Sequence, residues 1–235
     1  MCSPDSACRI SIIIPVINEA LVLPRLLAVL RPWRSECCEV IVVDGGSSDG
    51  TQEQARSGAD RLITTASGRA IQMNAGAAEA RGEVLWFLHA DTLPPNDGVE
   101  RICDSVAGGY GWGRFDVRLS GRAGILRVVE RMMNWRSRLS GIATGDQAIF
   151  VRRDWFQGEG GYPCIALMED VALCRTLKHR GPPACLHERV VTSSRRWEQG
   201  GIVKTILLMW RLRFAYWFGA DPQRLAREYR RVNRP

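Results

Sequence analysis

Residues 9–30 read RISIIIPVINEALVLPRLLAVL, an isoleucine-rich apolar run that is followed by leucines at helical spacing. The run at 9–16 predicts a strand buried on both faces, and 19–30 predicts an amphipathic helix. The same order recurs further along the chain, with strands expected at 40–43, 62–65 and 84–88 and helices at 50–57, 69–80 and 96–106. This alternation is typical of right-handed βαβ units, so the sequence predicts an α/β fold with a mostly parallel sheet flanked by helices.

After residue 108 the rhythm of the chain changes. We expect strands at 114–119, 147–151 and 190–193, and helices at 125–139, 169–179 and 202–218. Asp221 and Pro222 predict the start of a last helix, since aspartate caps helices and proline suits the first helical position. No repeat or linker-like tract is found, so we expect one domain over residues 1–200 and a basic, amphipathic helical extension over residues 201–235.

The composition excludes several classes of protein. The chain has 235 residues, of which 46% are hydrophobic and 24% charged, a balance that is globular and neither disordered nor fibrous. Residues 195–235 hold 10 basic and 3 acidic side chains, so the whole net charge of +7 belongs to this segment. A protein that binds nucleic acid through a uniformly basic surface is therefore disfavoured, and we expect no nucleic-acid partner.

The sequence also indicates a compartment. None of the 8 cysteines has the C-x2-C spacing of a zinc or redox site, and residues 1–9 are polar and unlike a signal peptide. No stretch reaches the ~18 apolar residues of a spanning helix. We expect a cytoplasmic protein with reduced thiols.

Polar residues follow three of the expected strands, at the edge of a parallel sheet where ligands bind. They are Pro15, Asn18 and Glu19 after the first strand, Asp44 after the second, and His89, Ala90 and Asp91 after the fourth. At least two carboxylates would meet near one crevice, where oxygen ligands can hold a divalent cation. The glycines after Asp44 lack the G-x-G-x-x-G spacing, so a dinucleotide fingerprint is excluded.

Six short motifs in order carry a resemblance to a known family. They are PVINE at 15–19, VVDGGSSDGT at 42–51, GRAIQMNAG at 68–76, FLHAD at 87–91, MED at 168–170 and SRRW at 194–197. Over roughly residues 10–200 the chain resembles family 2 glycosyltransferases with the GT-A fold. The GRAxQMN and HAD motifs look like a small bacterial branch of that family. The resemblance implies sugar transfer from a nucleoside-diphosphate sugar with inversion.

The resemblance also implies roles for single residues, each at its matching position. The nucleoside or phosphates of the donor would contact Pro15, Asn18, Glu19, Asp44, Arg69, Asn74 and Ala90. Asp91 would hold Mn2+ or Mg2+ on the diphosphate. His89 stands at the first acid of the family's D-x-D motif, where its imidazole could also bind the metal or pack beside the ribose. Asp170, beside Glu169, would be the general base. Arg195, Arg196 and Trp197 would meet the acceptor or the diphosphate.

Several functions compete on these residues. The leading one is metal-dependent sugar transfer to an acceptor hydroxyl, which needs a base for the hydroxyl and cations for the leaving diphosphate. One alternative is transfer to a polyprenyl phosphate at a membrane face, and another is a non-catalytic anion- or membrane-binding protein on the same scaffold. A sugar nucleotidyltransferase is disfavoured, because no glycine-rich activating loop with a lysine lies near the N-terminus.

The segment at 202–218 predicts an amphipathic helix. Its expected apolar stripe consists of Ile202, Ile206, Met209, Trp210, Phe214 and Trp217. Lys204, Arg211 and Arg213 interrupt the run, so spanning is unexpected. The pattern suits peripheral contact with the inner membrane face, or a helix that packs on its own domain or forms a homodimer.

Overall fold

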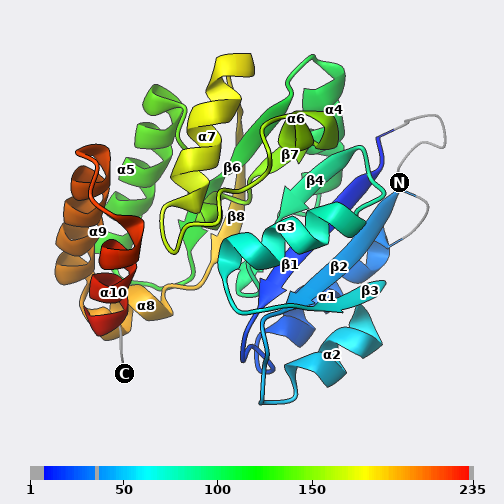
Figure 1. Ribbon diagram of the computed structural model, residues 1–235, viewed down its shortest axis with the longest axis horizontal. Coiled ribbons are helices and arrows are strands. Elements are labelled where there is room, and N and C mark those ends of the chain that lie inside the picture. The colour runs from blue at the N-terminus through cyan, green and yellow to red at the C-terminus, as the bar shows by residue number, and fades with distance from the viewer. Residues whose placement is uncertain (1–7, 35–36, 233–235) are drawn as a thin grey trace.

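One eight-stranded sheet runs through the computed structural model, which describes residues 8–34 and 37–232 (Figure 1). The strand order is β3-β2-β1-β4-β7-β6-β8-β5. The strands are β1 (Ile10–Val16), β2 (Cys38–Asp44), β3 (Arg61–Thr64), β4 (Val84–Phe87), β5 (Thr92–Leu93), β6 (Trp112–Leu119), β7 (Phe150–Arg152) and β8 (Ala184–Thr192).

Strand direction confirms the expected α/β fold with a mostly parallel sheet. β1 pairs in parallel with β2 and β4, β2 with β3, and β6 with β8. The antiparallel strand β7 lies between β4 and β6, and β5 is antiparallel to β8. The carboxyl ends of β1, β2, β4, β6 and β8 therefore share one edge with the beginning of β7.

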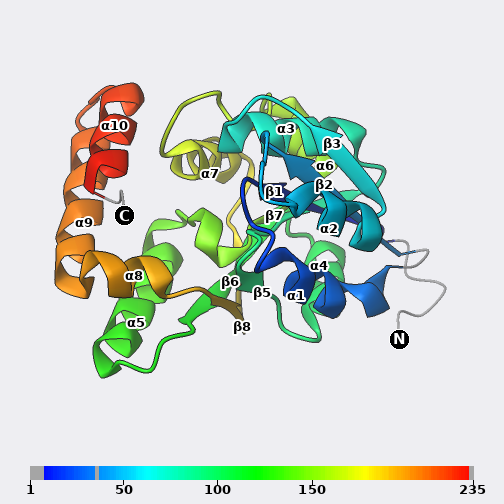
Figure 2. The ribbon, with the colours of Figure 1, turned by 90° about the horizontal axis from the view of Figure 1, so that it is seen from below.

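Helices cover both faces of the sheet, as Figure 2 shows. One apolar core lies between the sheet and α1 (Leu23–Leu30), α2 (Thr51–Gly58), α4 (Gly98–Ala107) and α5 (Gly124–Ser140). A second core lies under α3 (Arg69–Glu79), α6 (Arg153–Gly158) and α7 (Glu169–Arg180). The 3-10 helices are η1 (Arg31–Trp33) and η2 (Gly145–Gln147).

Two elements begin later than the sequence predicts. α1 starts at Leu23 instead of residue 19, because the backbone N–H groups of residues 18–20 donate to side chains of the loop after β2. The strand expected at 147–151 starts at Phe150, because residues 145–147 form η2 and Ala148 has a left-handed backbone with φ of 49°.

The C-terminal segment forms α8 (Arg195–Gly200), α9 (Ile202–Trp217) and α10 (Pro222–Val232). α9 and α10 pack against each other and against the loop before α7, through Leu208, Leu212, Leu225 and Met168. Asp221 caps α10 as predicted, with its Oδ1 atom accepting a 3.0 Å hydrogen bond from the Gln223 N–H.

The expected apolar stripe of α9 is half wrong. Ile202, Ile206 and Met209 turn toward the protein and pack on its cores. The exposed apolar side chains of α9 are instead Val203, Leu207, Trp210, Phe214 and Trp217. The predicted stripe combines residues from both sides of the helix. Both sides of α9 are apolar, so the spacing of apolar residues does not show which side packs against the protein. No helix in the described part of the chain is both long and apolar enough to cross a membrane.

Candidate active site

The loops after β1 and β2 are joined at the carboxyl edge of the sheet. The N–H of Asn18 donates to Ser47 Oγ at 2.9 Å, and the N–H of Glu19 donates to Thr51 Oγ1 at 2.8 Å. The side-chain oxygen of Asn18 accepts the Ser48 N–H at 2.9 Å, and Asn18 itself has a φ of 54°. Asn18 therefore fixes one loop on the other, while Pro15 lies half-exposed near the end of β1.

Asp44 is fully buried at the tip of β2. Its carboxylate accepts hydrogen bonds from the Gly46 and Ser47 N–H groups, the Ser47 hydroxyl and the Gln52 amide. Burial acts to raise the pKa of Asp44, but these hydrogen bonds outweigh it and hold the pKa below its usual value. The carboxylate thus already accepts hydrogen bonds from the following loop and from Gln52 of α2. A nucleoside that bound to Asp44 would have to replace one of these donors.

The GRAIQMN motif lies on α3, and two of its residues hold the fold together. The amide of Gln72 donates to the carbonyls of Val16 and Val43, each at 2.8 Å, which joins the ends of β1 and β2. Asn74 pairs with the backbone of Tyr162 through both its amide atoms, at 2.7 and 2.9 Å. The amide of Asn74 therefore joins α3 to the loop after α6, and its contact with the nucleotide stays a prediction.

Residues from three elements meet beyond the end of β4. Burial raises the pKa of the half-buried Glu19, and the nearby Asp91 carboxylate raises it further, while the charges of Arg195 and His89 lower it. Glu19, His89 and Asp91 thus share one region, as the order of strands predicted, and Arg195 lies near them. The methyl group of Ala90 is buried in the core, so only its backbone could contact a ligand.

Asp146 is a site residue that was not predicted. Its Oδ1 atom lies 3.4 Å from Nδ1 of His89. η2 reaches this edge because β7 is antiparallel to β4, with Trp86 opposite Phe150, so the segment before β7 lies beside the end of β4. The acid of TGDQ before an expected strand was the available signal, but only strand direction decides at which edge it lies.

The two acids of the MED motif face different partners at the start of α7. Oδ2 of Asp170 accepts a 2.9 Å hydrogen bond from the Gly145 N–H. Glu169 is buried, and its Oε1 atom lies 3.8 Å from Nη1 of Arg69. Burial and the neighbouring Asp170 raise the pKa of Glu169, against the opposing effect of Arg69. Glu169 therefore lies against Arg69, while Asp170, the predicted base, faces Gly145 of η2.

A small cavity of about 60 Å³ joins these groups. It is lined by Arg69, His89, Asp146, Glu169 and Asp170 from the main sheet and its helices. Met209, Arg213 and Tyr229 from α9 and α10 also line it, so the C-terminal extension forms one wall of the site. The sequence did not predict this wall.

The SRRW motif forms the start of α8. The exposed Arg195 lies close enough to Glu19 to lower the pKa of its carboxyl. Trp197 is partly buried against the core and lines a groove beside α9. The side chain of Arg196 lies outside the described part of the structure.

The fit of a divalent metal can be judged from the donors present. Among the described residues no three or more His, Cys, Asp or Glu are arranged to hold a metal. Mg2+ in nucleotide sites is commonly held by one or two carboxylates together with phosphate oxygens. Asp91, with Glu19 near it, fits such a partial donor set. The Nδ1 atom of His89 faces Asp146, a contact that metal-binding histidines commonly make with their other ring nitrogen, so Nε2 is the atom of His89 that could bind a metal.

Comparison with known proteins agrees with this geometry. Residues 11–152 match the family described as Glycosyl transferase family 2. The undecaprenyl-phosphate 4-deoxy-4-formamido-L-arabinose transferase of Pseudomonas aeruginosa is 30% identical over 148 residues. These cover 57% of this chain and 41% of that protein, so the chain matches less than half of the relative's length.

Solved structures with the same fold include two that contain nucleotide sugars. TarS of S. aureus, in complex with UDP-GlcNAc, superposes with a TM-score of 0.63 at 17% identity, covering 79% of this chain and 58% of that one. The mannosyltransferase PcManGT of Pyrobaculum calidifontis, in complex with GDP-Man and Mn2+, has a TM-score of 0.60 at 23% identity, covering 91% and 63%. The fold is therefore of the GT-A type, and the chain belongs to glycosyl transferase family 2.

Proposed function

We propose that this protein transfers a sugar from a nucleoside-diphosphate sugar to an acceptor hydroxyl, with inversion and with a divalent metal. The observation that carries the proposal is the hydrogen bond between Asp170 and Gly145. It brings a carboxylate from the start of α7 beside His89 at the end of β4, two residues from Asp91. A base and a diphosphate site would then lie at one edge of the sheet.

Each group has one task in this reaction. Asp170 takes the proton of the acceptor hydroxyl as the new bond to the sugar forms and the bond to the diphosphate breaks. General-base help of this kind is worth ~10²–10⁴-fold. Asp91 would hold Mn2+ or Mg2+, and the metal would supply positive charge for the leaving diphosphate. Arg195, near Glu19, adds positive charge on that side.

The donor would lie along the loops after β1 and β2. Pro15 and Asn18 are accessible there, and Arg69 is near enough to the carboxylates of Glu169, Asp146 and Asp170 for them to raise its pKa against the effect of burial. The structures of TarS and PcManGT named above contain a uridine and a guanosine donor. A nucleoside-diphosphate sugar is therefore the donor class that the family and the site support.

A second candidate acceptor is a lipid phosphate at a membrane face. The names of curated relatives include undecaprenyl-phosphate transferases. Exposed apolar side chains on α9 and basic side chains in the same segment suit peripheral contact with anionic lipid. A phosphate oxygen is already ionised and needs less help from a base, so Asp170 would matter less for such an acceptor.

A donor screen tests the proposal. UDP-, GDP-, TDP- and ADP-sugars are added to the full chain with Mn2+, with Mg2+ or with EDTA, and thermal unfolding is recorded. A true donor at ~100 times its Kd should raise stability by about 2.7 kcal/mol, and only with metal present. Release of nucleoside diphosphate in the presence of cell extract then reports transfer. If none of these donors stabilises the folded protein with either metal, the proposal is wrong.

A further inference from the structure

An apolar groove lies between α5 and α9, two helices that run side by side at one end of the molecule (Figures 1 and 2). Its volume is about 310 Å³, within the ~300–1,000 Å³ of small-molecule pockets. α5 contributes Val129, Met132 and Met133, and α9 contributes Ile206, Met209 and Trp210. The lining is that of a site for a hydrocarbon chain.

The groove adjoins the cavity lined by Asp170. Asp146, Met209 and Arg213 line both spaces, so the head of a molecule in the groove would lie next to the cavity of the proposed base. The other end is open, because Trp135 and Trp210 line the groove while 67% and 55% exposed. A long ligand could therefore enter from outside and present its head to the donor sugar.

Two arginines line the groove, and one of them, Arg213, also lines the cavity. Nε and Nη2 of Arg136 and Nε of Arg213 are buried and have no hydrogen-bond partner among the described residues. Burial, with the positive charge of Arg213 close by, lowers the pKa of Arg136 to about 10. Buried cationic donors without partners are costly, and a phosphate satisfies arginine forks well.

We propose that the groove between α5 and α9 binds the acceptor of the reaction, a lipid whose hydrocarbon chain lies in the groove and whose phosphate head is held by Arg136 and Arg213. The inference rests on the second candidate acceptor of the proposed function, a lipid phosphate, because it assigns that acceptor to the same site. α5 and Arg136 lie within the matched residues 11–152, whereas α9 and Arg213 lie beyond them, so the family match says nothing of the α9 wall of the groove.

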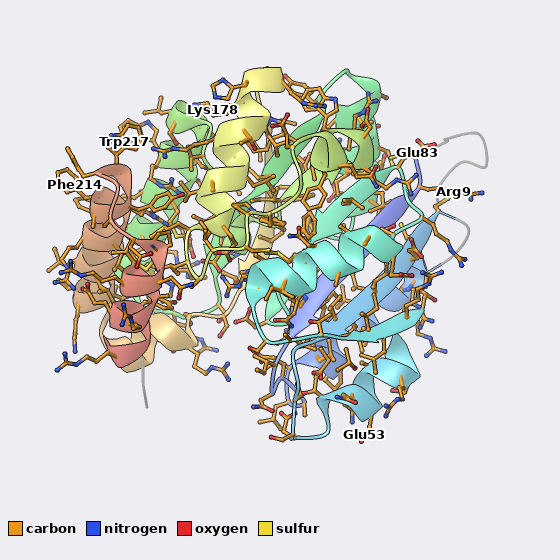
Figure 3. The ribbon with its side chains drawn as sticks, in the orientation of Figure 1. Arg9, Glu53, Glu83, Lys178, Phe214 and Trp217 are labelled. Carbon is orange, nitrogen blue, oxygen red and sulfur yellow. The ribbon has the colours of Figure 1, made fainter. Side chains whose placement is uncertain are left out.

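The surface around the open end has the character that a membrane lipid requires. Val128, Trp135 and Leu139 on α5 and Leu207, Phe214 and Trp217 on α9 are exposed apolar side chains. Figure 3 shows Phe214 on the outer side of α9 and Trp217 at the upper end of that helix, where the Arg175 guanidinium lies 4.8 Å from its ring. Both helices that line the groove thus also carry exposed apolar side chains.

Binding of farnesyl phosphate to the full chain tests this assignment, with farnesol and inorganic phosphate as matched probes. Tryptophan fluorescence reports binding, since Trp197 and Trp210 line the groove. Farnesyl phosphate should bind at least tenfold more tightly than farnesol, and inorganic phosphate should not compete at the same concentration. Equal binding of farnesyl phosphate and farnesol, or full competition by inorganic phosphate, would overturn the proposal.

Variants separate the head site from the chain site. Arg213→Gln and Arg136→Gln should each weaken farnesyl phosphate at least tenfold and change farnesol less than twofold. Met132→Glu, at a partly exposed wall position, should weaken both. Lys204→Gln removes one charge from the exposed side of α9 and should bind as the wild type does. Thermal unfolding checks that each variant is folded, and unchanged binding in both folded arginine variants contradicts the head assignment.

A measurement of donor binding distinguishes a failure of this inference from a failure of the proposed function. The same variants are tested for metal-dependent stabilisation by the donor sugar nucleotide, which should persist in Arg136→Gln. If a donor binds but farnesyl phosphate does not, the groove assignment is wrong and the proposed function stands. If farnesyl phosphate binds while no donor does, the sugar-transfer proposal is wrong and the groove remains a lipid site.

Discussion

The backbone N–H of Gly145 donates a hydrogen bond of 2.9 Å to Oδ2 of Asp170, across 25 residues of chain. This bond orients the carboxylate at the start of α7 toward the end of β4. The Oδ1 atom of Asp170 accepts a second hydrogen bond, from the Val171 N–H. Asp146, the next residue of η2, lies at the same time against His89. Two elements from the second half of the chain therefore complete a site that begins in the first half.

Asp170→Asn should leave donor binding intact and reduce sugar transfer by two or more orders of magnitude, since the amide keeps the size of the side chain but is not basic. Donor-dependent thermal shift and initial rates measure the two effects. Asp154→Asn, at a surface carboxylate paired with Arg152, is the control and should transfer normally. Normal transfer by folded Asp170→Asn would show that the acceptor needs no base and would favour a phosphate oxygen.

Asp91→Ala should abolish metal-dependent stabilisation by donor nucleotides while the protein still folds, because the carboxylate proposed to hold the metal on the diphosphate is gone. Calorimetric titration of the donor with and without Mn2+ measures this. The control is Asp97→Ala, which removes a surface carboxylate paired with Arg101 on α4. Wild-type metal dependence in Asp91→Ala would assign the metal to other residues.

Gly145→Ala should lower the transfer rate, because the added Cβ would lie 2.7 Å from Nε2 of His89. Either His89 or η2 must shift, which disturbs the hydrogen bond to Asp170 and costs about 1–3 kcal/mol of stability. In a double-mutant cycle His89→Ala should recover part of that stability. Gly124→Ala, where nothing lies within 4 Å of the added Cβ, is the control. Unchanged rate and stability in Gly145→Ala would contradict the packing described here.

Asp44→Asn should change how stability depends on pH. The pKa of Asp44 is lower in the folded protein than in the unfolded chain, so its contribution is present above the unfolded value of ~3.9. It is lost as the pH falls from there through the folded value. Urea unfolding should show the variant about 1–3 kcal/mol less stable at pH 7, with the difference shrinking below pH ~4. Asp104→Asn, on the surface of α4, serves as the control. A difference that stays constant with pH contradicts the prediction.

Replacing Leu207, Phe214 and Trp217 together by Glu should abolish binding to anionic liposomes. The wild-type protein should co-float with them at low salt and less at high salt, since basic side chains add attraction that salt screens. Tyr110→Glu changes an exposed aromatic residue outside α5 and α9 and should float as the wild type does. A wild-type protein that never floats at low salt rules out the membrane contact.

Much of the fold could be predicted from local pattern. The isoleucine and valine runs form β1 and β2 close to their predicted bounds, because strands buried on both faces have no polar alternation to misread. Asp221 caps α10 as expected, since a cap depends on neighbours in sequence. The motifs after β1 and β4 likewise meet at one edge because parallel strands end together.

Other parts depend on contacts that no local pattern contains. The sequence by itself determined the strands, the parallel edge and the residues that the family resemblance carries there. Only the tertiary structure placed Asp146 and the Arg136–Arg213 pair, because the direction of β7 and the packing of α9 on α5 and Met168 decide them. It also showed that the Asn74 amide pairs with the Tyr162 backbone, a long-range contact that no local pattern predicts.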